Sequence, residues 1–98
     1  FYRALNLSSR KPEITMKIVE CYVKLENRSK AIKELKHLLN RYPDFHSARI
    51  KLGQVFVEES QSHLARQEWE EVLDKDPKNN SAIKLLKSLD EGEGLIEL

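Results

Sequence analysis

Residues 52–77 read LGQVFVEESQSHLARQEWEEVLDKDP, and this stretch decides the fold because its spaced residues recur 34 positions earlier. The closing prolines of the two copies, Pro43 and Pro77, are themselves 34 residues apart. A fixed period of this length indicates a solenoid built from repeated helical units. The residues that match across the two copies are Ile18 with Leu52, Tyr22 with Phe56, Ala31 with Ala65, Leu35 with Trp69, and Leu39 with Leu73.

The same register continues beyond both copies. Ala48 is matched by Ala82 and Leu52 by Leu86, while Phe1 precedes Leu35 by 34 residues. Each such unit buries its apolar face only against its neighbours, so roughly three units are needed for stability. We therefore expect flanking partial repeats on both sides of two full ones.

This pattern resembles the tetratricopeptide repeat, in which a leucine, a glycine and an aromatic residue are followed by an alanine, a second aromatic residue and a proline. The second copy carries Gly53 at the small position, whereas the first carries Val19 there. Neither copy has the opening aromatic residue, because Thr15 and Arg49 stand at that position. The resemblance extends to about Asp90 and implies an all-α, right-handed superhelical solenoid of antiparallel helix pairs with about six helices.

Apolar residues at helical spacing place these elements in the chain. We expect a tetratricopeptide-like domain over 1–90 and a flexible acidic tail over 91–98, because the tail is rich in glycine. The domain divides into a partial repeat 1–9, a repeat 12–43, a repeat 46–77 and a capping helix 80–90. The expected helices are 1–7, 12–25, 29–42, 46–59, 62–75 and 80–90.

The boundaries of these helices carry suitable residues. Pro12 suits a first helical turn, and Asn27 and Ser62 are expected to cap the helices that follow them. Lys87 and Asp90 stand where earlier units have core residues, so the last helix is expected to turn a polar face to solvent. Because the chain begins with a phenylalanine that fits an interior repeat, we expect it to be the C-terminal piece of a longer solenoid.

Charge is distributed unevenly. Residues 1–51 carry twelve Lys or Arg against five acids, and residues 52–98 carry five against eleven, so a net charge of +7 is followed by one of −6. The basic half suits an acidic partner or a second copy. Solvated helix faces are the favoured explanation, since such charges mostly serve solubility. Because no exposed aromatic residues stand among its lysines, nucleic acid is not the expected partner.

No constellation of residues predicts catalysis, a metal or another cofactor. His37, His46 and His63 are isolated, without a second ligand at helical spacing. Cys21 matches apolar residues in the register and is expected to be a buried packing thiol. No run approaches the roughly 18 apolar residues of a membrane span. We expect a non-enzymatic protein, with the cytoplasm as the default compartment.

The resemblance implies that the first helix of each pair lines a concave face, which typically receives a peptide or a partner helix. The residues carried over to that face are Glu13, Met16, Lys17, Glu20, Val23, Lys24, Ser47, Ile50, Lys51, Gln54, Val57, Ser81, Lys84 and Ser88. Apolar members of this set would form a floor between polar flanks. Scattered surface residues, or contacts to an absent repeat, are the alternative.

Chaperone-tail binding is disfavoured, because the two-carboxylate clamp of the family has no counterpart at Met16, Glu20, Lys51, Ser81 and Leu85. The chain is therefore interpreted as a protein interaction scaffold that binds a protein or peptide. Two alternatives remain open. One is a homo-oligomerisation module that associates through its uncapped N-terminal end. The other is a docking or regulatory arm of an enzyme whose catalytic domain lies upstream.

Overall fold

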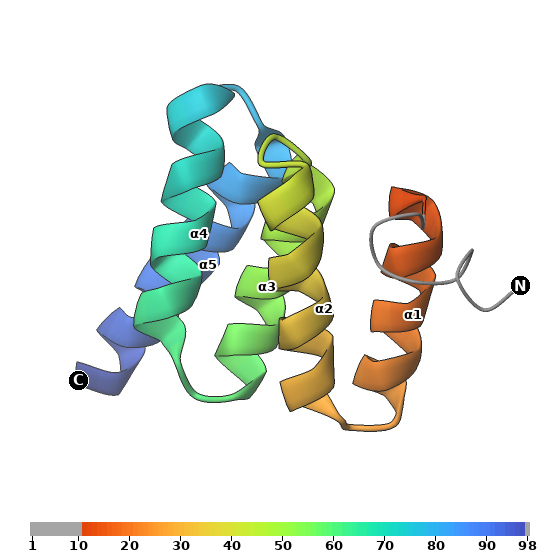
Figure 1. Ribbon diagram of the computed structural model, residues 1–98. Helices are drawn as coiled ribbons and strands as arrows, with labels where there is room; N and C mark the ends of the chain where they lie inside the picture. The colour runs from red at the N-terminus through yellow and green to blue at the C-terminus, as the bar shows by residue number, and fades with distance from the viewer. Residues whose placement is uncertain (1–10, 98) are drawn as a thin grey trace, which may run out of the picture.

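The computed structural model describes residues 11–97, with side chains described through Glu91, and it folds this part of the chain entirely into helices and short connections (Figure 1). The expected helix 1–7 lies outside the described residues. Five helices are present in the described part: α1 (Pro12–Lys24), α2 (Arg28–Arg41), α3 (His46–Glu58), α4 (Ser62–Lys75) and α5 (Asn80–Glu97). The predicted all-α class is thus confirmed.

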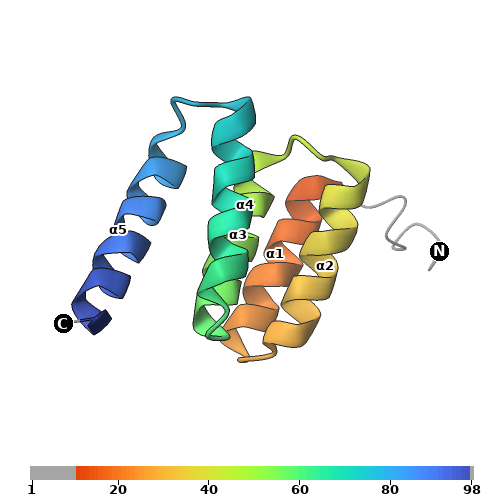
Figure 2. The same cartoon turned by 90° about the vertical axis from the view of Figure 1, so that its left-hand side faces the viewer.

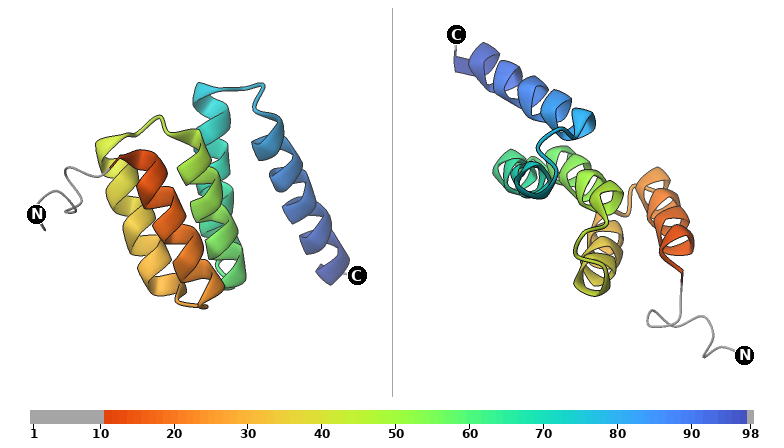
Figure 3. Two further views of the ribbon diagram at one scale, coloured as in Figure 1. Left: turned by 90° about the vertical axis from the view of Figure 1, so that its right-hand side faces the viewer. Right: turned by 90° about the horizontal axis from the view of Figure 1, so that it is seen from above.

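Each helix packs against the next one in the chain. Short turns reverse the chain between them, so α1 and α2 form one antiparallel hairpin and α3 and α4 form a second (Figure 2). Seen from one end, the helices follow a zigzag, and α5 continues beyond the second hairpin (Figure 3). This is the arrangement expected of a helical repeat; the right-handed superhelix stays a prediction.

The turns inside the two hairpins repeat each other residue for residue. Glu26 and Ser60, 34 positions apart, both adopt a left-handed backbone with φ of 59° and 63°. The N–H of the next residue then donates to the carbonyl of Tyr22 in the first hairpin and of Phe56 in the second, at 2.8 Å in both. Such a bond satisfies a carbonyl that the end of a helix leaves unpaired.

Two of the three expected boundary residues have their expected roles. Pro12 lies in the first turn of α1, and Asn27 Oδ1 accepts from the backbone N–H of Lys30 at 3.4 Å. The prediction for Ser62 is wrong, because the repeated turn places Gln61 at the capping position and Ser62 at the first helical residue. A further cap was not predicted: Asn79 Oδ1 accepts from the N–H of Ala82 at 3.0 Å.

The core runs through the contacts between successive helices and contains the residues of the 34-residue register. Ala31 and Ala65 are fully buried, as expected for positions of close helix approach. Gly53 is buried against Trp69, whose Nε1 would lie 2.3 Å from a Cβ atom at position 53. The indole of Trp69 is 2% exposed, and its Nε1 donates to the backbone carbonyl of Ile50 at 3.1 Å. Glycine is therefore required sterically in the second hairpin.

Arg49 gives the second hairpin a polar contact in place of the missing aromatic residue. Its guanidinium donates to Glu68 on α4 at 2.9 Å and to the backbone carbonyl of Pro43 at 3.1 Å. One side chain thus ties α3 to its partner helix and to the preceding turn. At the equivalent position of α1 stands Thr15, which is buried.

Two expectations about exposure and helix length are wrong. Cys21 is exposed, because α2 is the helix that packs on α1 among the described residues and it covers a different side. α5 continues as helix past residue 90 to Glu97. Gly92 and Gly94 do not stop it, since a glycine inside a helix costs only about 1 kcal/mol relative to alanine. Flexibility of 91–98 stays a prediction.

The outer side of α5 is polar where the register predicts a terminal cap. Lys87 and Asp90 are both exposed, in agreement with that expectation. Asp90 also forms a salt bridge with Arg66 of α4, which fastens α5 to the second hairpin. Within residues 11–97, none of the helices has both the length and the apolar content that a membrane crossing requires.

Candidate binding groove

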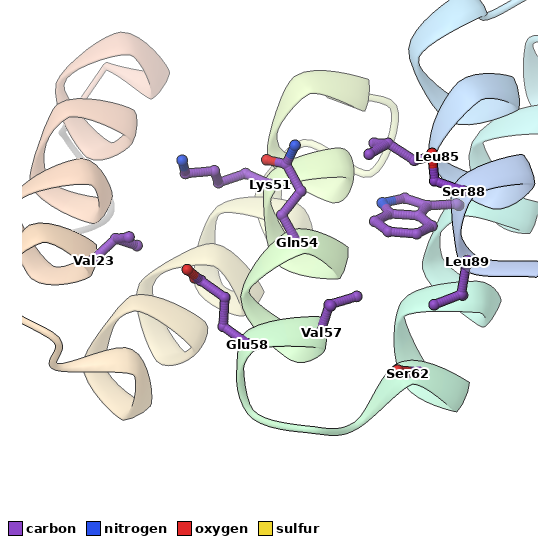
Figure 4. Close-up of a pocket in the computed structure, with 10 residues that line it drawn as sticks. Val23, Lys51, Gln54, Val57, Glu58, Ser62, Leu85, Ser88 and Leu89 are labelled. Atoms are coloured by element: carbon purple, nitrogen blue, oxygen red, sulfur yellow. The ribbon is translucent and has the colours of Figure 1, made fainter. Parts of the chain in front are cut away.

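A pocket of about 580 Å³ opens on the side of the molecule where α1, α3 and α5 face solvent, with one wall from α4 (Figure 4). Half-buried and exposed residues of three helices surround it, and the buried Trp69 lies beneath. Its lining residues are Val23, Lys51, Gln54, Val57, Glu58, Ser62, Trp69, Leu85, Ser88 and Leu89.

Helix α3 supplies the central wall because its sequence separates two faces. Lys51, Gln54 and Glu58 follow one another at intervals of three and four residues, so they project from one side of the helix. Leu52 and Phe56 belong to the other side and are buried in the core. The helix is held by packing on both α2 and α4, which fixes its polar face toward the pocket.

The pocket has two chemically different parts. Lys51 and Glu58 extend toward the side of α3 on which Val23 of α1 lies (Figure 4). Val57 lies on the side that faces α5, where Leu85 and Leu89 line the same pocket. An apolar part is thus joined to a charged part along one helix. This combination suits a ligand that presents both an apolar and a charged side chain.

The two charges of the pocket are not equivalent. Glu58 lies 4.0 Å from the guanidinium of Arg28, at the start of α2, and shares a salt bridge with it. Lys51 is half-buried, and in the described part of the chain no carboxylate pairs with its ammonium group. A ligand therefore meets an acid that is already partnered and a cation that is not.

The structure brings together five of the residues carried over from the family resemblance: Val23, Lys51, Gln54, Val57 and Ser88. Val23 lies near the end of α1, the three residues of α3 lie between its middle and its end, and Ser88 lies at the middle of α5. The other predicted residues do not line the pocket, and all but Glu20 and Lys24 belong to the N-terminal halves of their helices. These are Glu13, Met16, Lys17, Glu20, Lys24, Ser47, Ile50, Ser81 and Lys84.

Met16 and Ile50 differ from the other residues of this second group. Both are partly buried and pack against the hydrophobic core. The carbonyl of Ile50 is also the acceptor for the Trp69 indole. Their apolar side chains thus pack on the core of the chain itself, which neither interpretation of the sequence proposed.

Sequence reasoning missed five lining residues: Glu58, Ser62, Trp69, Leu85 and Leu89. Leu85 stands in register with Lys51, so the repeat itself could have found it. Glu58 follows Gln54 by one helical turn and was equally accessible to pattern reasoning. Trp69 matches Leu35 in the register and is buried, and no sequence signal indicated that a residue so buried also borders a pocket.

The described residues offer no group of three or more His, Cys, Asp or Glu side chains that would hold a metal ion. The pocket itself contains neither histidine nor cysteine. What its residues can do chemically is bind, through apolar contact, amide hydrogen bonding from Gln54 and a single positive charge from Lys51.

A family model described as tetratricopeptide repeat matches residues 16–44. That segment comprises α1 from Met16, the whole of α2 and the turn as far as Asp44. No curated protein matches the chain. Tetratricopeptide repeats typically act as non-catalytic modules of protein interaction. Residues 16–44 are thus similar to a tetratricopeptide repeat, which supports the resemblance found in the sequence.

Proposed function

We propose that this chain is a non-enzymatic interaction scaffold that holds a peptide or a partner helix in the groove lined by α1, α3 and α5. The pocket carries this proposal, because it joins an apolar floor to polar flanks on the face formed by the first helices of successive pairs. The repeat organisation proposed with it comprises full units over 12–43 and 46–77 and a cap that begins at residue 80.

The apolar floor is accessible to a ligand. Val57 lines it and is 38% exposed, so its side chain is open to a ligand. Ser88 and Gln54 beside it offer hydrogen-bonding groups to a peptide backbone. Burial of Val57 under a ligand would remove apolar surface from water, which is the main favourable term in most association.

Self-association is a second candidate, because another apolar surface is exposed on the outer side of α1. Ile14 is exposed there, Leu25 is 74% exposed, and Cys21 lies between them along the helix. The predicted uncapped end depends on Phe1, Ala4 and Leu5, which lie outside the described residues. Sedimentation of the chain at low and high salt tests this candidate, since charge attraction between the two halves weakens as salt is added.

The groove is tested by selecting peptides from a random phage library on the wild-type chain. Selected peptides should lose binding to Val57→Asp, because a buried, unpaired carboxylate in the apolar floor is unfavourable. Ile83→Asp is the matched control: Ile83 is 43% exposed on α5 but does not line the pocket. Both variants should melt as cooperatively as the wild type. Equal binding by the two variants, or no selected peptide at all, would contradict the proposal.

A further inference from the structure

We infer that the groove selects an acidic, apolar peptide segment of a partner protein, with a bulky apolar side chain beside Val57 and a carboxylate at Lys51. This inference rests on the proposed groove and adds the chemistry of its occupant. Lys51 carries the charge argument, since in the described part of the chain no acid pairs with it, whereas Glu58 already has Arg28 as its partner.

The apolar part of the pocket accepts a large side chain. Val57, Leu85 and Leu89 line it from two helices, with the indole of Trp69 beneath them. None of these side chains offers a charged group to a ligand, and the indole N–H of Trp69 is already bonded to the carbonyl of Ile50. A polar side chain placed here would lose its hydrogen bonds to water without replacement, so leucine or phenylalanine is favoured.

The charged part of the pocket selects the charge of the ligand's second side chain. A carboxylate at Lys51 gains an ion pair in a half-buried setting, whereas a lysine there meets a like charge. Glu58 projects from the same side of α3 as Lys51, seven residues further along the helix, and disfavours a second acid in this charged part. The occupant therefore needs one acid at one defined distance from its apolar side chain, and a generally acidic peptide is not sufficient.

That distance follows from the helix. Lys51 and Val57 are six residues apart on α3, which corresponds to about 9 Å along the axis at a rise of about 1.5 Å per residue. An extended peptide advances about 3.3 Å per residue, so the same length spans about three residues. Because the two side chains also project from different sides of α3, this axial length is a minimum, and three positions is the shortest spacing of acid and apolar residue that reaches both, in one order or the other.

Two pairs of phage libraries test this inference. One pair fixes Asp-x-x-Leu or Lys-x-x-Leu, and the other fixes Leu-x-x-Asp or Leu-x-x-Lys, with all remaining positions random. On the wild-type chain, the Asp library of at least one pair should be enriched about tenfold over its Lys counterpart, which is the size of effect expected for one close charge pair. Lys51→Glu should reverse that preference.

Lys84→Glu is the matched control. It makes the same change of charge on an exposed residue of α5 that does not line the pocket, so the preference for Asp should persist. Selected peptides should also change the fluorescence of Trp69, the only tryptophan in the chain. Loss of the preference in Lys84→Glu but not in Lys51→Glu would overturn the assignment to Lys51.

Failure of this inference is distinguishable from failure of the groove. Random-library peptides that bind through Val57, combined with equal enrichment of the Asp and Lys libraries, would leave the groove intact and overturn the acidic partner. Absence of binding from every library would overturn both. A dimer of the chain alone that dissociates on Lys51→Glu would make a second copy the occupant and overturn the assignment to a partner protein.

Discussion

The two helix hairpins solve the same packing problem with different pairs of side chains. At the close approach of α1 and α2 the register places Val19 and Leu35, and at that of α3 and α4 it places Gly53 and Trp69. All four positions are buried. The first hairpin thus fills this contact with two side chains of medium size, whereas the second fills it with one very large side chain opposite a glycine. The summed volume of the two residues is therefore specified more strictly than the identity of either residue.

A second difference lies in what covers the first helix of each hairpin. Val55 of α3 is 1% exposed, whereas Cys21, its counterpart on α1, is exposed. Helix α3 packs on both α2 and α4, but α1 packs mainly on α2 in the described part of the chain. Position in a repeat therefore determines which way a side chain points, and the neighbouring unit determines whether it is buried.

The largest expected effect comes from giving the second hairpin the valine of the first. Gly53→Val places a Cβ atom where Trp69 Nε1 is 2.3 Å away, so the helices must separate or the indole must move. We expect a loss of about 3 kcal/mol in the free energy of unfolding, at the upper end of the usual range for overpacking. Chemical denaturation of the two proteins measures it.

The double variant Gly53→Val, Trp69→Leu recreates the pair Val19 and Leu35 and sharpens this comparison. It should recover about 1 kcal/mol or more relative to Gly53→Val alone, because the clash is removed. Recovery should be incomplete, since the hydrogen bond from Trp69 to the Ile50 carbonyl is lost. A double variant less stable than Gly53→Val would show that the two hairpins do not share a packing rule.

An intermediate effect is expected from comparing thiols at the equivalent positions 21 and 55. Cys21, the only cysteine, should react with a thiol reagent at nearly the rate of an unfolded thiol. Val55→Cys in a Cys21→Ser background should react only as the domain opens, and should cost about 1 kcal/mol through lost apolar contact. Equal rates would mean that residues outside the described part cover α1 as α2 covers α3.

Much of this fold was predictable from the sequence, because it depends on local spacing. The ends of α1 to α4 agree with prediction within a residue, and Gly53, at the small position of the register, is buried where α3 and α4 approach closely. The error at Ser62 was avoidable, since Gln61 stands in register with Asn27. The repeated turn thus predicts the capping position better than the capping preference of serine does.

The groove was less predictable, because its composition depends on how far each helix extends past its neighbour. The resemblance predicted that Lys51 and Val57 belong to the groove, and both line the pocket, but it offered no reason to prefer them to Glu20 or Lys24, which do not line it. The exposure of Cys21 was missed for a related reason: burial at the end of a repeat array is set by the adjacent unit, which the residue itself does not encode.

The smallest expected effect concerns the ion pair between the turn after the first hairpin and the end of the second hairpin. Asp44, in the turn after the first hairpin, accepts a hydrogen bond from Lys75 at the end of α4, at 2.8 Å. This bond, and then the positive charge of Lys75, hold the pKa of Asp44 below its ordinary value of 3.8. Because the folded state favours the charged carboxylate, the contribution is fully present above pH 3.8 and is lost as the pH falls through the lower pKa of the folded state.

Asp44→Asn should therefore lower the melting temperature slightly near neutral pH, and the gap to the wild type should close as the pH falls below 3.8. The effect is small because both side chains are largely in water, where an ion pair is weak and screened by salt. Asp74→Asn, at an exposed carboxylate next to Lys75 in the sequence, is the control and should show no such closing gap. A gap that widens in acid would mean that the pKa of Asp44 is raised on folding, so that this contact does not hold the two repeats together.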